Sequence, residues 1–237
     1  MAVEKNMTLT AVLREYPSEI PIRPYTFRDR AVVRSICCAT ADRGRPLENI
    51  YPDCELVADL VTRYYTDIEP GFSWVAGEEG QVAGYLTGAP DTRRCNRIMA
   101  FRVGPRAVLA AMGRGALRRR QNWLMLKALA LTPGCLLTRR HFALDDFPAH
   151  LHIDILAAYR GRGVGRRLMA EFLVQLKEAG RRGVHAFVRS DNSSACSFFE
   201  RQGFRALDRC SLPLPQNGGA GSVPNIVYGL RIGGEVS

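Results

Sequence analysis

A strand, a glycine-bearing turn and an amphipathic helix follow one another over residues 151–169, and this junction constrains the fold more than any other stretch. Residues 151–157 alternate apolar and polar side chains, which is typical of a strand. Three glycines between 161 and 165 leave the backbone uncovered, and from Val164 onward apolar residues recur at helical spacing. The first-turn amides of such a helix have no intrahelical acceptor and lie at its positive end. The junction therefore predicts a phosphate-binding site.

The spacing of the glycines decides which kind of phosphate site this junction resembles. A dinucleotide-binding turn requires Gly-x-Gly-x-x-Gly, but Arg166 occupies the position of the last glycine. A P-loop requires Gly-Lys-Ser/Thr, whereas Gly165 precedes two arginines. Residues 160–165 read Arg-Gly-Arg-Gly-Val-Gly, which resembles the pyrophosphate-binding motif Arg-x-x-Gly-x-Gly of the GNAT superfamily of acyl-CoA-dependent N-acetyltransferases. Taken alone, a basic glycine-rich turn also fits a purely structural role.

A second motif lies further downstream and strengthens the resemblance. Residues 184–189 are typical of a strand, and residues 192–204 read NSSACSFFERQGF. They resemble the second GNAT signature, Asn-x-x-Ala-x-x-(aromatic)-Tyr-x-x-x-Gly-Phe, with every spacing kept. Asp191 or Asn192 can cap the intervening helix, and Gly203 can end it. The chain is therefore identified as a member of the GNAT superfamily.

Composition places few limits on the class of protein. With 237 residues, of which 46% are hydrophobic and 24% charged, the balance is that of an ordinary globular chain. No apolar run approaches the roughly 20 residues that span a bilayer, and residues 1–17 lack a signal-peptide core. We therefore expect a cytoplasmic protein without a membrane partner. The seven cysteines form an odd set without a CxxC pair, which predicts reduced thiols and no metal site.

The net charge of +10 is carried largely by groups of arginines. They lie at 118–120, 139–140, 166–167 and 181–182. Such clusters can indicate nucleic-acid binding, but a solvated arginine-rich face is their more common meaning. The pyrophosphate and 3′-phosphate of CoA give a more local reason, because arginine binds phosphate well. The sequence therefore does not favour a nucleic-acid partner.

The remaining pattern predicts one domain over residues 20–237, preceded by a tail or extra helix at 1–19. The expected elements are a strand at 20–24, helices at 25–40 and 52–66, a hairpin at 73–78 and 81–88, and strands at 204–211 and 225–232. A segment at 91–146, with a helix expected at 116–131, precedes the central strand. It is interpreted either as extra packing or as a lid over the acceptor cleft.

Three further stretches refine the resemblance. IRPYTFRDR and QVAGYLTGAPDT are similar to an actinobacterial-type branch of the superfamily, and PAHLHIDIL resembles the acetyltransferase-like domains attached to some O-GlcNAc hydrolases. The resemblance implies a GNAT fold of the α/β class, in which helices flank a mixed, mostly antiparallel central sheet. Its fourth and fifth strands are expected to splay apart. The segment at 91–146 is then a helical insertion before the central strand.

The resemblance also implies where acetyl-CoA binds. In the family the exposed backbone of the fourth strand bonds the pantetheine arm like an added strand. The glycine turn holds the pyrophosphate, and an asparagine sits beside the pantetheine. Carried over residue by residue, these roles fall on Ile153, Ile155, Ala157, Arg160, Gly161, Arg162, Gly163, Val164, Gly165 and Asn192.

The groups that carry out proton transfer depart from the family pattern in one place. The usual general acid is the tyrosine that ends the aromatic pair of the second motif, and here Phe199 stands there. A CoA thiol should have a pKa near the roughly 8.5 of cysteine, so it is a tolerable leaving group without that acid. For the base, His150, His152 and Asp154 share one face of the central strand. His152 or Asp154 is the expected proton acceptor, and each also fits a satisfied polar residue of the core.

We therefore expect an acyl-CoA N-acetyltransferase that acetylates a primary amine of a small molecule or a protein by direct attack in a ternary complex. Acetyl-CoA is the expected co-substrate, and no metal is expected. The alternative, motivated by Phe199, is a catalytically weak or inactive acyl-CoA-binding domain. The acceptor is not readable from the sequence, and the oligomeric state, including a homodimer, stays open.

Overall fold

The computed structural model describes residues 20–40, 42–46, 53–120, 122–124, 126–127, 144–212 and 222–232. Within them a seven-stranded sheet has the strand order β1-β2-β3-β4-β5-β7-β6. Neighbouring strands are antiparallel, except that β4 and β5 are parallel. The predicted mixed, mostly antiparallel sheet is confirmed. The tail predicted at 1–19 lies outside the described residues.

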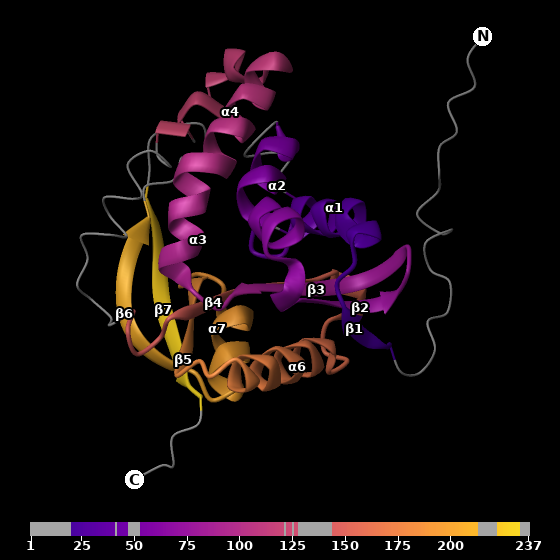
Figure 1. Ribbon diagram of the computed structural model, residues 1–237, viewed down its shortest axis with the longest axis vertical. Helices are drawn as coiled ribbons and strands as arrows, with labels where there is room; N and C mark the ends of the chain where they lie inside the picture. The colour runs from indigo at the N-terminus through magenta and orange to yellow at the C-terminus, as the bar shows by residue number, and fades with distance from the viewer. Residues whose placement is uncertain are drawn as a thin grey trace.

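Helices cover both faces of this sheet (Figure 1). The strands are β1 (Ile22–Pro24), β2 (Ser73–Glu78), β3 (Gln81–Ala89), β4 (Ala149–Ile155), β5 (Gly183–Arg189), β6 (Arg205–Leu212) and β7 (Val223–Arg231). The helices are α1 (Arg30–Thr40), α2 (Cys54–Arg63), α3 (Thr92–Ile98), α4 (Gly104–Gly113), α6 (Val164–Glu178) and α7 (Ser193–Arg201). In Figure 1, α1–α4 lie on one side of the sheet and α6 and α7 on the other. The α/β architecture is the predicted one.

The alternation of side chains along β4 directs its two kinds of residue to opposite helical layers. Leu151 is 2% exposed and packs in the core to which α6 contributes Leu168 and Phe172. On the other face of the sheet, Tyr85 of the neighbouring strand β3 packs with Val33 of α1. Because successive side chains of a strand point to opposite faces, the polar residues of β4 are turned toward α1–α3.

The strand boundaries agree with the prediction to within about two residues, whereas the helix predicted at 25–40 begins only at Arg30, after a 3-10 turn, and the helix predicted at 52–66 spans Cys54–Arg63. The sequence predicts a strand over 151–157, but β4 begins at Ala149 and ends at Ile155. The Leu156 N–H still donates to the Ala83 carbonyl of β3 at 2.9 Å, and Ala157–Tyr159 then turn in a 3-10 helix. The prediction that Ala157 belongs to the strand is therefore wrong, because the chain has already left the sheet there.

The insertion before β4 differs most from the prediction. The sequence predicts a helix at 116–131, whereas the structure has a 3-10 turn at Ala116–Arg118, followed by helical residues among those described from 120 to 127. It also contains α3 and α4, joined by a π turn (Met99–Val103), which were not predicted. Pro105 lies in the first turn of α4, where its missing N–H is not needed. A proline therefore begins a helix here.

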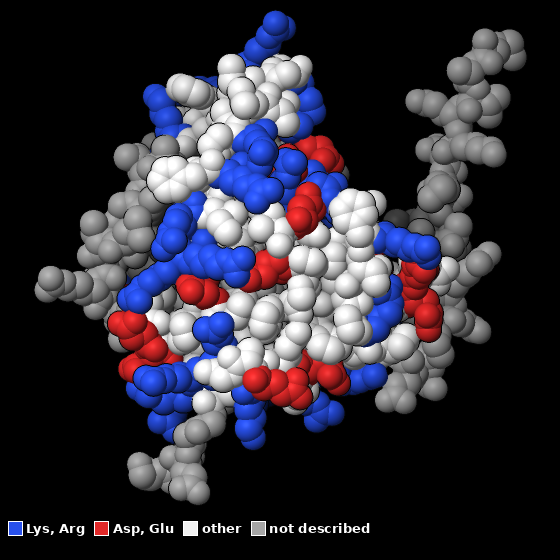
Figure 2. Space-filling view, viewed as in Figure 1, with Lys and Arg blue, Asp and Glu red and all other residues white. Residues whose placement is uncertain are grey.

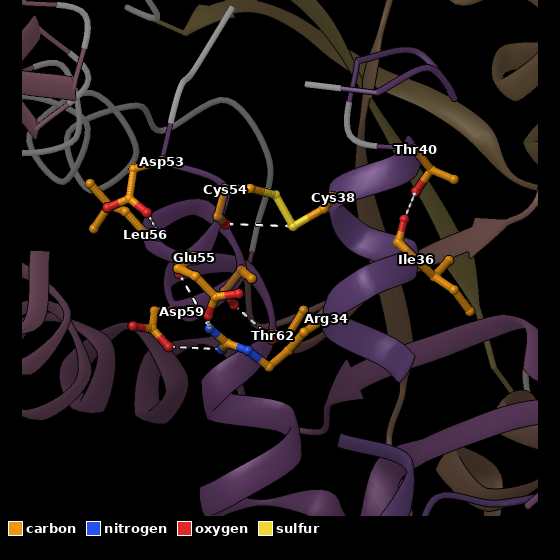
Figure 3. The surroundings of a disulfide bond; sticks show 11 residues. Arg34, Ile36, Cys38, Thr40, Asp53, Cys54, Glu55, Leu56, Asp59 and Thr62 are labelled. Atoms are coloured by element: carbon orange, nitrogen blue, oxygen red, sulfur yellow. Dashed lines mark hydrogen bonds and ion pairs between the residues drawn. A yellow bond between two sulfur atoms is a disulfide. The ribbon is translucent and has the colours of Figure 1, made fainter. Parts of the chain in front are cut away.

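A disulfide between Cys38 and Cys54 joins α1 to the start of α2 (Figure 3). The expectation of reduced thiols is wrong for this pair, because the two cysteines are sixteen positions apart in the sequence and no motif marks them. The bridge closes the connection between the helices into a loop, which lowers the entropy of the unfolded chain. The free cysteines among the described residues are Cys37, Cys95, Cys196 and Cys210.

A buried ion pair holds the same two helices together. Arg34 Nη1 lies 2.7 Å from Asp59 Oδ1, and the guanidinium also contacts Glu55, as Figure 3 shows. The side chains of Arg34 and Asp59 are only 10% and 8% exposed. Removing one member of such a pair leaves an uncompensated buried charge. The pair therefore fixes how α1 lies against α2.

Candidate active site

β4 and β5 run side by side for a short distance and then separate. Their parallel pairing covers Ala149↔Val184 and His150↔His185, although each strand has seven residues. On its other edge β4 pairs with β3 as far as Ile155. The C-terminal half of β4 is therefore unpaired on the side of β5. This is the predicted splay between the fourth and fifth strands.

The register between β3 and β4 shows which backbone groups face this gap. The Leu156 N–H donates to the Ala83 carbonyl, so the even-numbered residues of β4 direct their backbone groups toward β3. Ile153 and Ile155 therefore direct theirs toward β5, beyond the last β4–β5 pair. The Ile155 carbonyl accepts a hydrogen bond from Arg160 Nε at 2.8 Å. Within the described chain, neither the N–H nor the carbonyl of Ile153 has a partner on a neighbouring strand.

The glycine turn in front of α6 is open. Gly161 and Gly163 have left-handed backbone angles (φ +77° and +78°), and a Cβ built on either glycine would meet nothing within 4 Å. Inside α6 the backbone bonding begins with the Arg167 N–H, which donates to the Gly163 carbonyl at 3.1 Å, so the N–H groups of residues 164–166 precede it. Among the described residues, no side chain caps this helix. The turn thus presents free amides at the positive end of a fifteen-residue helix, which suits an anion.

The side chain of Arg160 is bonded to the protein's own carbonyls. Its Nε donates to the Ile155 carbonyl, and its Nη2 donates to the Gly44 carbonyl (3.1 Å) in the connection between α1 and α2. Gly44 has a left-handed backbone (φ +80°), which favours glycine, and a Cβ there would press on the same guanidinium. These two bonds orient the guanidinium and occupy two of its five N–H donors. Its role as a phosphate ligand stays a prediction.

The remaining residues of the predicted phosphate-binding stretch take different positions. The guanidinium of Arg162 lies over the ring of Tyr159, 5.7 Å from its centre. The Val164 side chain is buried. A Cβ at Gly165 would lie 3.0 Å from Ile155 Cδ1, so this glycine permits close packing of α6 on β4. A ligand can therefore approach the backbone of the turn before α6 and the exposed side chain of Arg162.

Asn192 stands at the N-cap of α7, as predicted. Its Oδ1 accepts a hydrogen bond from the Ala195 N–H at 3.2 Å. Arg43, in the connection between α1 and α2, lies 3.3 Å from Asp191. The same connection contacts the glycine turn through Gly44. It therefore touches the chain on both sides of the gap, a contact for which the sequence holds no signal.

His150 belongs to a closed chain of hydrogen bonds. Its Nδ1 lies 2.8 Å from Thr92 Oγ1, and its Nε2 lies 2.6 Å from the Tyr65 hydroxyl. The Thr92 hydroxyl donates to the Pro148 carbonyl (2.8 Å), so it accepts from Nδ1–H, and Nε2 accepts from Tyr65. Burial lowers the pKa of His150 well below 6.5. His150 is therefore a neutral, fully bonded residue of the core.

His152 is the exposed residue of β4. Its ring lies edge-on to the rings of Tyr65 (5.5 Å between centres) and His150 (5.9 Å). The surrounding protein lowers the pKa of His152 below its usual 6.5, while contact with solvent limits that shift. The imidazole is therefore neutral at pH 7 and open to solvent, which are the two conditions for accepting a proton.

Asp154 is held by a tyrosine of the neighbouring strand. The hydroxyl of Tyr85, which is its register partner on β3, donates to Asp154 Oδ2 at 2.7 Å. Burial raises the pKa of this carboxyl above its usual value, and the Tyr85 hydrogen bond opposes that rise. The Tyr85 hydrogen bond therefore fixes the position of this partly desolvated carboxyl group. The sequence predicts Asp154 but not Tyr85, because the register between two strands separated by the insertion is not visible in it.

Two buried thiols lie near this polar row and cannot act as nucleophiles. Burial raises the pKa of Cys37 and of Cys95 to about 12. At neutral pH both groups are protonated, whereas the nucleophile is the thiolate. Within the described ranges, no group of histidine, cysteine, aspartate or glutamate residues could hold a metal ion.

Phe199, which replaces the family's tyrosine, is part of an aromatic cluster. Its side chain is 5% exposed and its ring stacks on Tyr228, with 5.9 Å between centres and 16° between planes. The rings of Phe198 and Phe204 lie edge-on to it. Packing of this kind stabilises the contact of α7 with β7. The position holds no group that could protonate a leaving thiolate.

Acid should destabilise this fold through its buried histidines. His185 is 1% exposed and burial lowers its pKa to about 4, whereas in the unfolded chain it should titrate near 6.5. The contribution of the neutral His185 to the free energy of unfolding is complete above pH 6.5. It is lost as the pH falls toward 4, because only the unfolded chain binds the proton in that range. We expect the free energy of unfolding to fall by about 2 kcal/mol between pH 7 and pH 5 from this group.

Urea titrations at the two pH values measure this effect. The variant His185→Asn should be less stable at pH 7, but its stability should fall less between pH 7 and pH 5 than that of the wild type. Equal changes in the two proteins would contradict the assignment.

Residues 134–204 match the sequence profile of the Acetyltransferase (GNAT) family. The fold is similar to the crystal structure of SsHAT, with a TM-score of 0.70 and 29% identity over 91% of this chain and 100% of that chain. It is also similar to yncA from Salmonella typhimurium with its cofactor acetyl-CoA (TM-score 0.54, 13% identity, 92% and 97% covered). A third similar structure is the ribosomal-protein-alanine N-acetyltransferase from Brucella melitensis (TM-score 0.52, 18% identity, 90% and 99% covered). At their level of identity, the last two structures indicate a likeness of fold alone.

Proposed function

The chain carries a GNAT acetyltransferase domain, and on this premise we propose that it transfers an acetyl group from acetyl-CoA to a primary amine of a small molecule or a protein. The amine attacks the thioester directly while both substrates are bound. Acetyl-CoA itself supplies the activated acyl group, and the chain's residues hold the two substrates and accept the proton of the amine.

The observation that carries this proposal is an open glycine turn next to an unpaired strand edge. The free amides of residues 164–166 suit a pyrophosphate. The backbone of Ile153 suits an extended pantetheine arm, which can bond to it as an added strand does. Gly161 and Gly163 leave room for a ligand beside the turn. The similar structure from Salmonella contains acetyl-CoA as its cofactor, which supports the same ligand here.

His152 is the proposed base. An amine with a pKa of roughly 10 must lose a proton before it can attack. His152 is neutral and reaches solvent, so it can accept that proton directly or through a water molecule. Asp154, fixed by Tyr85, would orient the amine and attract it by charge. The buried thiols of Cys37 and Cys95 take no part, since the attack needs no covalent intermediate on the protein.

Phe199 favours a second candidate function. With a buried phenyl ring at the position of the acid, the leaving thiolate departs without a proton from that residue, which a pKa of roughly 8.5 makes tolerable but slower. A catalytically weak or inactive acyl-CoA-binding domain therefore remains the alternative to an efficient transferase.

Thiol release from acetyl-CoA, followed with a thiol-reactive dye across a panel of primary amines, separates the two candidates. The proposal expects release that depends on the amine and exceeds the rate in buffer. Release at the buffer rate for every amine, together with acetyl-CoA binding by calorimetry, would favour the binding domain. Absence of acetyl-CoA binding would contradict both.

A further inference from the structure

We propose that the outer face of the insertion binds the surface of an anionic lipid bilayer. The segment concerned, called the basic arm below, comprises residues 92–120, 122–124 and 126–127: α3, the π turn, α4, a 3-10 turn and the helical residues that follow. This inference is independent of acetyl transfer. It also departs from the sequence-based expectation of no membrane partner, which rested on the lack of a spanning segment. No described helix is long and apolar enough to cross a bilayer, so the contact would be peripheral.

The basic arm carries charge of one sign. The sequence has no acidic residue between Asp91 and Asp145. Three arginines of the arm pair with acids elsewhere, namely Arg93, Arg94 and Arg114. The others have no acidic partner among the described residues: Arg97, Arg102, Arg106, Arg118, Arg119 and Arg120. Unpaired arginines gathered on one projecting segment produce a local positive field that attracts an anionic surface.

The same arm exposes most of the large apolar side chains that reach solvent. Phe101 is 82% exposed, Leu109 66%, Met112 57% and Trp123 49%. Outside the arm, the exposed large apolar side chains of the described chain are Phe27 and Val174. Single exposed apolar residues are ordinary, but a group of them on one element marks an interaction surface.

These side chains are not needed for the core of the insertion. α4 packs on α2 through Ala107 and Ala111, which are fully buried beside Leu56. Leu109 and Met112 lie on the other side of α4, one turn apart. A helix that is already packed on one face has therefore kept apolar side chains on its solvent face as well.

Arginines and apolar side chains lie next to each other on this outer face. Figure 2 shows the surface over α4 as blue and white. Arg102 and Arg106 are exposed and one turn apart on the same face as Leu109. At the end of α4 a wide, shallow hollow of about 580 Å³ is lined by Met112, Gly113, Arg114, Gly115, Leu117 and Arg118. Lys127 Nζ also lies 5.5 Å from the ring centre of the exposed Trp123.

A lipid surface fits this arrangement better than the other partners. The end of the arm around α4 projects from the rest of the described molecule (Figure 1), so it can reach a flat bilayer. Apolar side chains enter the acyl boundary while arginines extend to the phosphates above it. A second copy of the chain would bring the same positive charge. A nucleic acid would use the arginines but leave Leu109 and Met112 in water.

Cosedimentation with vesicles tests the proposal. The protein should pellet with vesicles of phosphatidylcholine and phosphatidylglycerol, and much less with phosphatidylcholine alone. The double variant Arg102→Ala/Arg106→Ala should bind about 30-fold more weakly. Phe101→Ser/Leu109→Ser should lose about tenfold or more. The matched control Phe27→Ser/Val174→Ser, which also removes two exposed apolar side chains, should bind like the wild type.

Fluorescence adds a readout of depth. Lipids brominated on their acyl chains should quench Trp123 in the bound protein, and the variant Trp123→Phe should lose this quenching while Trp74 still emits. The proposal is overturned if the protein binds anionic vesicles no better than neutral ones. It is also overturned if the apolar double variant binds like its control, since charge alone would then explain the binding and any polyanion would suffice. It is also overturned if light scattering shows a dimer that Leu109→Ser dissociates.

Discussion

Replacing Gly163 with glutamate should lower the affinity for acetyl-CoA by about 100-fold or more. A Cβ at Gly163 meets open space, so the new side chain would occupy the volume in which the pyrophosphate is proposed to lie. Its carboxylate would take the free amides of residues 164–166 and repel the phosphates. Loss of two hydrogen bonds to a charged group, each contributing about 1.5–3 kcal/mol, is enough for that decrease. Isothermal calorimetry measures it.

The helix that carries this turn also provides the matched control. Gly180, just after the other end of α6, is left-handed as well (φ +66°), and a Cβ there would likewise meet nothing within 4 Å. Gly180→Glu thus adds the same charge and a similar backbone strain of about 1–2 kcal/mol, away from the proposed site. We expect it to bind acetyl-CoA like the wild type. Equal losses in both variants, or no loss in Gly163→Glu, would contradict the site.

His152→Ala should lower kcat by about 100-fold or more and leave the affinity for acetyl-CoA nearly unchanged. A positioned base contributes roughly 10²–10⁴-fold to the rate, and the proposed CoA contacts come from other residues. Only the neutral ring accepts a proton, so the wild-type kcat should fall as the pH drops through the pKa of His152, which lies below 6.5. In the variant this fall of kcat at low pH should be absent. Its kcat should instead increase steadily with pH up to the pKa of the amine.

Two further variants separate proton transfer from folding. His150→Gln breaks the bonds to Thr92 and Tyr65, so it should lower the melting temperature but leave the pH profile of kcat in place. Asp154→Asn can keep the hydrogen bond from Tyr85 and removes the charge, so it should raise KM for the amine. If His152→Ala kept the wild-type kcat and pH profile, His152 would not be the base.

The glycine turn could be predicted because everything that makes it is local. The pattern of Gly161 and Gly163 and the apolar spacing of α6 lie within one short stretch, and helix geometry alone directs the amides of residues 164–166 outward. The structure adds what the sequence cannot hold. The contact of Arg160 with Gly44, for instance, joins residues that are far apart in the chain.

The polar row on β4 illustrates the same limit. Alternation along the strand predicts that His150, His152 and Asp154 share a face, which is confirmed. Their different roles depend on neighbours from other elements. Tyr65 and Thr92 occupy both nitrogens of His150, whereas His152 reaches solvent. Which histidine is bonded and which is open therefore follows from packing and not from spacing.

The helices α3 and α4 escaped prediction for a physical reason. A helix is recognised in sequence by an apolar stripe on one side and polar residues on the other. In α4 the buried face is made of small residues, Ala107 and Ala111, and the exposed face carries Leu109 and Met112. Apolar residues therefore occur all around the helix, and Pro105 adds an apparent break.

The place of β7 in the sheet has a consequence for how the protein is made. β6 pairs with β7 and not with β5, and β5 pairs with β7 along its whole length but with β4 at only two positions. During synthesis on the ribosome, the edges of β5 and β6 that pair with β7 therefore stay unpaired until residues 223–231 have been synthesised. The half of the molecule next to the gap closes only when this late strand inserts between two earlier ones. A nascent chain should thus gain acyl-CoA binding abruptly once residues 223–231 have emerged from the ribosome.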